Sequence, residues 1–201
     1  MIIKMDITKF LNSRGFISFP EGYSQQINQQ VEDLIKLSNK PNMNIMEIGF
    51  NAGHSAEIFL YNNPSITLVS FDLGGTDHVD MAKKYIDFIY PNRHTLILGD
   101  STVTIPKYTF DNIGKIFDLI FIDGGHDYDV ANADLENCMK LSNKDTIVII
   151  DDTIYTQGWE RFWTIGPTKT WIEHLNNGTV KEINRRDYQY GRGMSWGKYT
   201  L

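Results

Sequence analysis

Four side chains that could bind a metal ion or move a proton follow two apolar segments of the chain. They are Asp123, His126, Asp151 and Asp152. The first apolar segment covers residues 117–122 and the second covers residues 146–150. Short apolar runs are typical of buried strands, and open α/β sheets bind ligands beyond the carboxyl ends of their strands. Three carboxylates and one imidazole at such an edge indicate a site for acid–base or metal chemistry.

A glycine-containing turn, EIGFNAG, follows an earlier predicted strand and opens a predicted helix. Gly49 and Gly53 allow the backbone to turn sharply there and to approach a ligand closely. The segment does not match the GxGxxG fingerprint of dinucleotide-binding folds, and no GK[ST] follows it as in a phosphate-binding loop. The turn therefore predicts a ligand that is not anchored by a pyrophosphate, and a turn without a ligand is the alternative.

Two more acidic residues stand at predicted strand ends. Asp72 ends the second strand, where a carboxylate can accept hydrogen bonds from ribose hydroxyls. Asp100 and Ser101 end the third strand, where they could bind the edge of an adenine ring. The alternative for each is a structural role in a turn or at the start of a helix.

The alternation of strands and helices predicts the fold class. Apolar runs at 44–48, 66–71, 94–98, 117–122 and 146–150 are separated by helical patterns at about 54–61, 81–90 and 130–141, and a further helical pattern at 27–37 precedes them. This order predicts a mostly parallel sheet covered by helices on both faces, an α/β Rossmann-like three-layer αβα sandwich. Two further strands, 179–186 and 194–200, are joined by a turn at residues 191–193 and must pair as an antiparallel hairpin. Seven strands result, with a helical cap expected over residues 1–43 and the main domain over 44–201.

Composition and charge exclude several classes of protein. The chain has 201 residues, of which 41% are hydrophobic, and a net charge of -6 without a basic cluster. The length favours one domain, or one domain with an appendage, and the charge does not indicate a nucleic-acid partner. The single cysteine, Cys138, excludes an intrachain disulfide. No apolar run approaches the roughly 18 residues of a membrane span, and no signal peptide is recognisable. We expect a cytoplasmic protein, and a homo-oligomer is compatible with the sequence.

Four motifs, taken in chain order, resemble those of class I S-adenosylmethionine-dependent methyltransferases. MEIGFNAGHSA resembles the glycine-rich first motif, FDLG the acidic second, GDS the third and FDLIFIDGGHDY the fourth. The resemblance extends over about residues 40–201 and includes the terminal hairpin. It implies S-adenosyl-L-methionine as cofactor. The cofactor-binding residues that it implies are Glu47, Gly49, Asn51, Gly53, His54, Ser55, Asp72, Leu73, Asp100, Ser101 and Asp123.

Within this class, FIDGGHDY followed by IVIIDDT resembles small-molecule O-methyltransferases that use a divalent metal. The similarity is greater to the macrolide-sugar type than to the catechol and caffeoyl-CoA type, which has an amide at the position of Asp152. The resemblance implies Mg²⁺ bound by Asp123, Asp151 and Asp152. It implies His126 and Asp123 as the catalytic residues, with His126 as the base. The implied acceptor is a small hydroxylated molecule, a sugar or a phenol.

Other interpretations of these residues stay open at this point. A metal-independent methyltransferase could use His126 alone, and a binding module could keep the cofactor fold without catalysis. The acids could serve turns and helix caps, and His126 could tie down the glycine turn. The aromatic segment 155–163 is a candidate wall for the acceptor, while Tyr23 and Phe19 are candidates to cover the cofactor.

Overall fold

Seven strands form one mixed sheet in the order β3-β2-β1-β4-β5-β7-β6 in this computed structural model, which describes residues 6–17 and 23–201. Neighbours from β3 to β5 are parallel, and β7 pairs antiparallel with both β5 and β6. The predicted fold class is confirmed. The strands are β1 (Asn44–Ile48), β2 (Thr67–Asp72), β3 (His94–Leu98), β4 (Leu119–Ile122), β5 (Ile147–Asp151), β6 (Val180–Tyr188) and β7 (Arg192–Tyr199).

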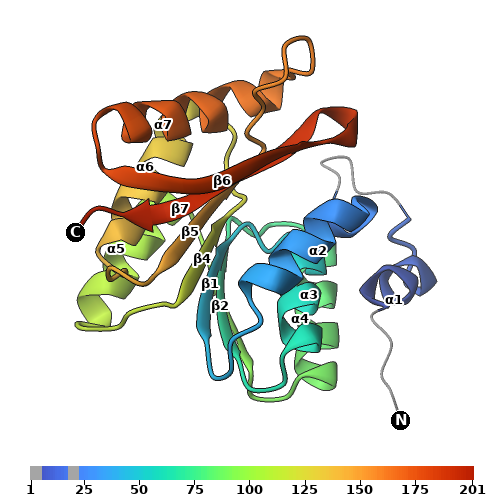
Figure 1. The fold of residues 1–201 in the computed structure, drawn as a ribbon. Coiled ribbons are helices and arrows are strands. Elements are labelled where there is room, and N and C mark those ends of the chain that lie inside the picture. The colour runs from blue at the N-terminus through green and yellow to red at the C-terminus, as the bar shows by residue number, and fades with distance from the viewer. Residues whose placement is uncertain (1–5, 18–22) are drawn as a thin grey trace.

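Helices cover both faces of the sheet (Figure 1). The helices are α1 (Ile7–Ser13), α2 (Asn28–Leu37), α3 (His54–Asn62), α4 (Asp77–Ile89), α5 (Ser101–Asp111), α6 (Tyr128–Met139) and α7 (Ile165–Asn176). The first four lie on one face and the last three on the other, where α5 contacts α6 and α6 contacts α7. Three short 3₁₀ turns complete the chain: η1 (Ser24–Gln26), η2 (Phe162–Thr164) and η3 (Gln189–Gly191). Phe19 lies outside the described residues.

Two hydrophobic cores sit on the two faces, and the strands supply them alternately. In β1, Ile45 belongs to the core under α2, α3 and α4, whereas Met46 belongs to the core under α5, α6 and α7. In β5, Ile149 belongs to the first core and Ile150 to the second. This is the two-residue period of a strand. Because both faces are covered, the strands are continuous apolar runs.

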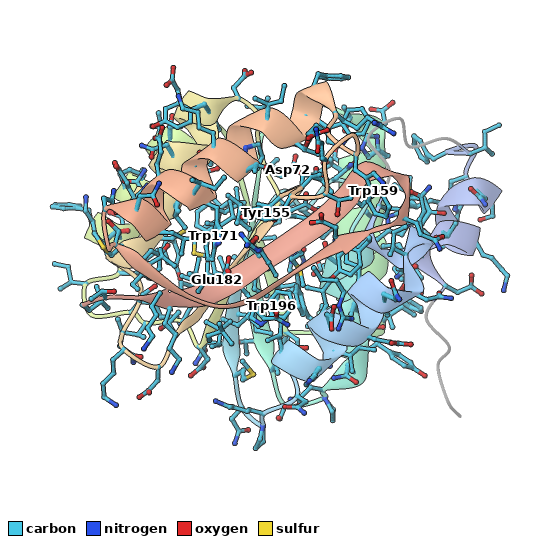
Figure 2. All side chains as sticks on the ribbon, turned by 45° about the horizontal axis from the view of Figure 1, so that its top comes forward. Asp72, Tyr155, Trp159, Trp171, Glu182 and Trp196 are labelled. Carbon is cyan, nitrogen blue, oxygen red and sulfur yellow. The ribbon has the colours of Figure 1, made fainter. Side chains whose placement is uncertain are left out.

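The terminal hairpin is fixed to the helical layer as well as to the sheet. Trp171 of α7 is fully buried, and its Nε1 donates to Glu182 Oε2 of β6 at 2.8 Å (Figure 2). The antiparallel pairing of β6 with β7 confirms the predicted hairpin, but its turn is displaced. The chain turns at Gln189–Gly191, and β7 already begins at Arg192, a residue that the sequence had placed in the turn.

Two helices were not predicted from the sequence. Helix α5 contains Pro106 and is rich in β-branched residues, which are poor helix formers. It forms because Asp100 Oδ1 caps it by accepting from the Thr102 backbone N–H at 2.9 Å, and because Ile105 is buried in the second core. Helix α1 has only seven residues and owes its place to tertiary contacts with α3 and α4.

Candidate active site

The carboxyl ends of β1 and β4 meet at Gly49, a residue that has no room for a side chain. Its φ is +94°, and a Cβ added there would lie 1.8 Å from the carbonyl oxygen of Asp123. The Gly49 N–H donates to the Phe71 carbonyl at 2.8 Å, and the Asp123 N–H donates to the Ile48 carbonyl at 2.8 Å. This close approach fixes where the strand β4 delivers Asp123.

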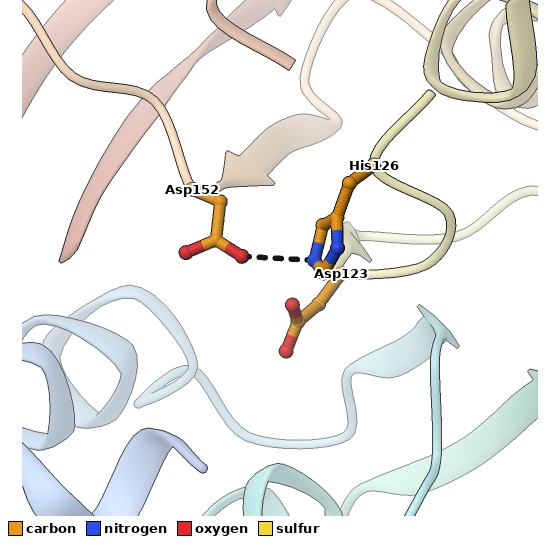
Figure 3. Close-up of side chains that lie close together, drawn as sticks. All are labelled: Asp123, His126 and Asp152. Carbon is orange, nitrogen blue, oxygen red and sulfur yellow. Dashed lines mark ion pairs between the residues drawn. The ribbon is translucent and has the colours of Figure 1, made fainter. Parts of the chain in front are cut away.

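Asp123, His126 and Asp152 converge at this edge (Figure 3). His126 Nε2 lies 3.0 Å from Asp152 Oδ2, and one ligand atom from each residue falls within 4.8 Å of the others. The loop that carries His126 is supported by α7, since a Cβ on Gly166 would lie 2.1 Å from the His126 carbonyl oxygen. The structure thus gathers two acids and an imidazole from two strand ends.

Asp151 has a different environment from Asp152. Both of its carboxylate oxygens accept from Gln30 Nε2, at 2.9 and 2.8 Å. The Arg192 guanidinium lies 3.6 Å from Asp151 and 3.4 Å from Asp152. Neither Gln30 nor Arg192 was singled out from the sequence, and no local pattern there points to them.

Burial and neighbouring charges disfavour the ionised form of Asp123. Burial is the main cause that raises the pKa of Asp123 well above its ordinary value, and the neighbouring carboxylates Asp151 and Asp152 raise it further. Arg192 acts in the opposite direction. A cation placed among these carboxylates would therefore be stabilised, as at other sites where like charges are crowded together.

The side chain of Asp72 organises the glycine turn that follows β1. Its two oxygens accept from the backbone N–H groups of Asn51 and Gly74, each at 2.7 Å. Asn51 has a positive φ of 44°, and its Oδ1 lies 2.7 Å from His78 Nε2. The neighbouring Leu73 side chain is 77% exposed. Asp72 therefore shapes the turn, which agrees with the structural role that the sequence offered as an alternative to ribose binding.

Glu47 is buried at the end of β1 and is held by two hydroxyls. Ser55 Oγ and Ser70 Oγ each donate to its carboxylate at 2.5 Å. Burial raises the pKa of Glu47 from 4.5 to about 7, against the lowering effect of these two hydrogen bonds. Ser55 thus contacts another residue of the glycine-rich motif through its side chain.

We expect Glu47→Gln to alter the pH dependence of stability. Between the unfolded pKa near 4.5 and the folded pKa of about 7, the folded chain binds more protons, so its stability falls as the pH rises through this window. Glutamine removes this loss. From about pH 5 to about pH 8, the stability of the variant relative to wild type should increase by about 2–3 kcal/mol. Urea unfolding of the two cofactor-free proteins at several pH values measures this. A difference in unfolding free energy that stays constant with pH would contradict it.

The remaining predicted cofactor residues occupy the starts of helices. Gly53 precedes α3 with a φ of +74°. His54 is buried in its first turn, with Nε2 lying 3.0 Å from Thr8 Oγ1. Asp100 caps α5, which agrees with the structural alternative for that residue. Ser101 begins the helix beside Asp134, whose carboxyl is fully buried.

Glu57 fixes the N-terminal segment to this region, a role that the sequence did not reveal. It is fully buried in α3 and accepts from the backbone N–H groups of Asp6 and Ile7 at 3.0 and 3.3 Å. Tyr85 Oη also donates to it, at 2.9 Å. Nearby, the ring of Tyr23 stacks on His54 with centroids 4.0 Å apart. The first helix is thus held over the start of α3.

The aromatic segment 155–163 is divided between buried and exposed side chains. Tyr155 is partly buried, and its Oη lies 3.2 Å from Ser195 Oγ. Trp159 is 39% exposed and lies near the hairpin turn (Figure 2). A Cβ added to Gly191 in that turn would lie 2.9 Å from the carbonyl oxygen of Trp159. Phe162 is 83% exposed.

Across residues 6–17 and 23–201, no helix combines the length and the apolar character needed to cross a membrane.

Comparisons with known proteins place the chain in a family. A model of the methyltransferase domain family matches residues 46–153, more than half of the chain. A search of curated proteins found no match. Among solved structures, an O-methyltransferase from Bacillus cereus in complex with S-adenosylhomocysteine is 19% identical, with 98% of this chain and 93% of that chain covered and a TM-score of 0.74.

A second solved structure with the same fold is the O-methyltransferase TomG from Streptomyces achromogenes, in complex with S-adenosylmethionine. It is 17% identical, with 100% of this chain and 92% of that chain covered and a TM-score of 0.75. The chain belongs to the methyltransferase domain family and is an S-adenosylmethionine-dependent methyltransferase of class I fold.

Proposed function

We propose that this protein transfers a methyl group from S-adenosylmethionine to a hydroxyl of a small molecule, a sugar or a phenol, with help from a divalent metal. The observation that carries the proposal is the convergence of Asp123, His126 and Asp152 beside the glycine turn. The O-methyltransferases from Bacillus cereus and Streptomyces achromogenes, which share the fold, support it.

The residues fit a hard divalent cation such as Mg²⁺. Carboxylate oxygens are ligands that such an ion prefers, whereas an imidazole suits it less well than Mn²⁺ or Zn²⁺. Asp152 Oδ1 is buried and makes no hydrogen bond among the described residues, and its nearest charged neighbour is Arg192 Nε at 3.4 Å. Asp123 and Asp152 would hold the metal, with Asp151 as a further carboxylate beside them and His126 within reach. The metal, when bound, would lower the pKa of a coordinated hydroxyl.

His126 is the proposed base of the reaction. It accepts the proton that the acceptor hydroxyl loses, and Asp152, 3.0 Å from Nε2, stabilises the imidazolium that forms. S-adenosylmethionine supplies the activated methyl group. We propose that the turn 47–55, together with Asp72, Leu73, Asp100, Ser101 and Asp123, binds it. The rest of the task is alignment of the hydroxyl with the methyl carbon.

We also propose that residues 1–43 form a helical cap on a methyltransferase domain over residues 44–201. The contacts of Glu57 with the start of α1, and of Gln30 with Asp151, support a cap that takes part in the site.

An assay of methyl transfer tests the proposed function. With isotopically labelled S-adenosylmethionine and a panel of sugars and catechols, we expect product labelled on oxygen. We expect a chelator to lower its rate at least about ten-fold and added Mg²⁺ to restore it. A label on nitrogen or carbon would contradict O-methylation. Turnover unaffected by the chelator would favour the alternative in which His126 acts without a metal.

A further inference from the structure

Adjacent acids at the end of β5 are held by different parts of the protein. Asp151 is almost fully buried, and Gln30 Nε2 donates to both of its oxygens at 2.9 and 2.8 Å. Asp152 instead pairs with His126, and the two acids share only the guanidinium of Arg192. Gln30 is itself fully buried, so its amide is fixed on Asp151.

The backbone explains this separation. Ile149 contributes to the core under α2, and Asp151, two residues later on the same strand, points to the same face. Asp152 has a φ of 56°, in the left-handed region, so the chain leaves the strand there. The Asp152 side chain therefore reaches the His126 loop rather than helix α2.

Helix α2 is locked in the position that this contact needs. Asp33, three residues after Gln30, accepts from Tyr188 Oη at 2.8 Å and pairs with Arg186 Nη1 at 2.9 Å. Both partners belong to β6. The amide of Gln30 is therefore held by the terminal hairpin, through contacts with residues more than 150 positions away in the chain.

Arg192 supplies a resident positive charge to the cluster. Its side chain is 11% exposed and lies within 3.6 Å of Asp151 and 3.4 Å of Asp152. A guanidinium cannot be deprotonated in this setting, so a divalent cation entering the site meets its repulsion. Asp151 is thus engaged by an amide and a cation before any metal binds.

We propose that Gln30 is a positioning residue that keeps Asp151 as a structural carboxylate, so that Asp123 and Asp152 are the carboxylates that face the metal, and that Arg192 is a resident charge shared by Asp151 and Asp152. This inference rests on the proposed function for the identity of the ligand. It reduces the set of metal ligands that the sequence motifs imply, because it assigns Asp151 to the contact between α2, β5 and β7.

A double-mutant cycle on thermal unfolding tests the clamp without any metal. Gln30→Leu leaves Asp151 charged and without its amide partner, which is costly in a buried site. In an Asp151→Asn background the residue is neutral, so Gln30→Leu should lower the melting temperature by about half as much or less. In an Asp152→Asn background it should lower it as much as in wild type. Equal losses in all three backgrounds would overturn the inference.

Titration with Mn²⁺, followed by electron paramagnetic resonance, gives the second readout. Asp152→Asn should weaken binding at least about ten-fold and Asp151→Asn less than about three-fold, while Arg192→Gln should tighten it about ten-fold. Equal weakening by the two asparagine variants, or no gain from Arg192→Gln, would overturn the inference. If no variant binds Mn²⁺, the proposed metal is wrong, and the unfolding cycle alone decides whether the clamp exists.

Discussion

Replacing His126 with asparagine is expected to lower kcat by roughly 10²–10⁴-fold, the usual contribution of a positioned general base. Asparagine retains a polar side chain but cannot accept the proton of the acceptor hydroxyl, and it loses the contact of His126 with Asp152. Single-turnover rates with a saturating acceptor and S-adenosylmethionine measure the loss. Its magnitude would separate a base from a residue that only stabilises the loop.

Asp127→Asn is the matched control for this variant. Asp127 is exposed, follows His126 directly and makes no side-chain cap with α6. We expect its rate to stay within about two-fold of wild type, since an exposed carboxylate contributes little. An equal loss of rate in both variants, or a loss of cofactor affinity in His126→Asn as large as its loss of rate, would contradict the role of a base.

Gly49→Ala is expected to be the most destabilising single methyl addition at the site. The added Cβ would lie 1.8 Å from the Asp123 carbonyl oxygen, and the backbone there has a φ of +94°. The ends of β1 and β4 would have to separate, which combines overpacking with backbone strain and costs about 3 kcal/mol or more. Urea unfolding measures this loss, and a decrease in cofactor affinity should accompany it.

Gly75→Ala measures the cost of backbone strain at a positive φ without any overpacking. Gly75 also has a positive φ, +84°, but nothing lies within 4 Å of an added Cβ. Its substitution should therefore cost only about 1 kcal/mol. Equal costs for the two alanine variants would show that the close approach of Gly49 to Asp123 does not hold the two strand ends together.

The sheet could be predicted from the sequence because both of its faces are buried. Strands of that kind are continuous apolar runs, and the runs ending at Ile48, Ile122 and Ile150 are of this type. Helix α5 could not be predicted, since Pro106 and its β-branched residues oppose helix formation locally. Its capping by Asp100 and the burial of Ile105 outweigh that preference.

The convergence of Asp123, His126 and Asp152 was also accessible from the sequence, because parallel strands bring their carboxyl ends to one edge. The contact of Gln30 with Asp151 was not, since it joins residues 121 positions apart through side-chain directions that no local pattern encodes. Arg192 was placed in the hairpin turn, whereas it is the first residue of β7. The roles of the individual cofactor residues stay predictions.

Calorimetric titration of the cofactor-free protein with S-adenosylhomocysteine, beside a parallel titration with NAD, tests the central claim most directly. The glycine turn, Asp72 and the carboxylate cluster at one sheet edge predict saturable heat at one cofactor per chain and none with NAD. A folded protein that gives no heat with S-adenosylhomocysteine would contradict the account.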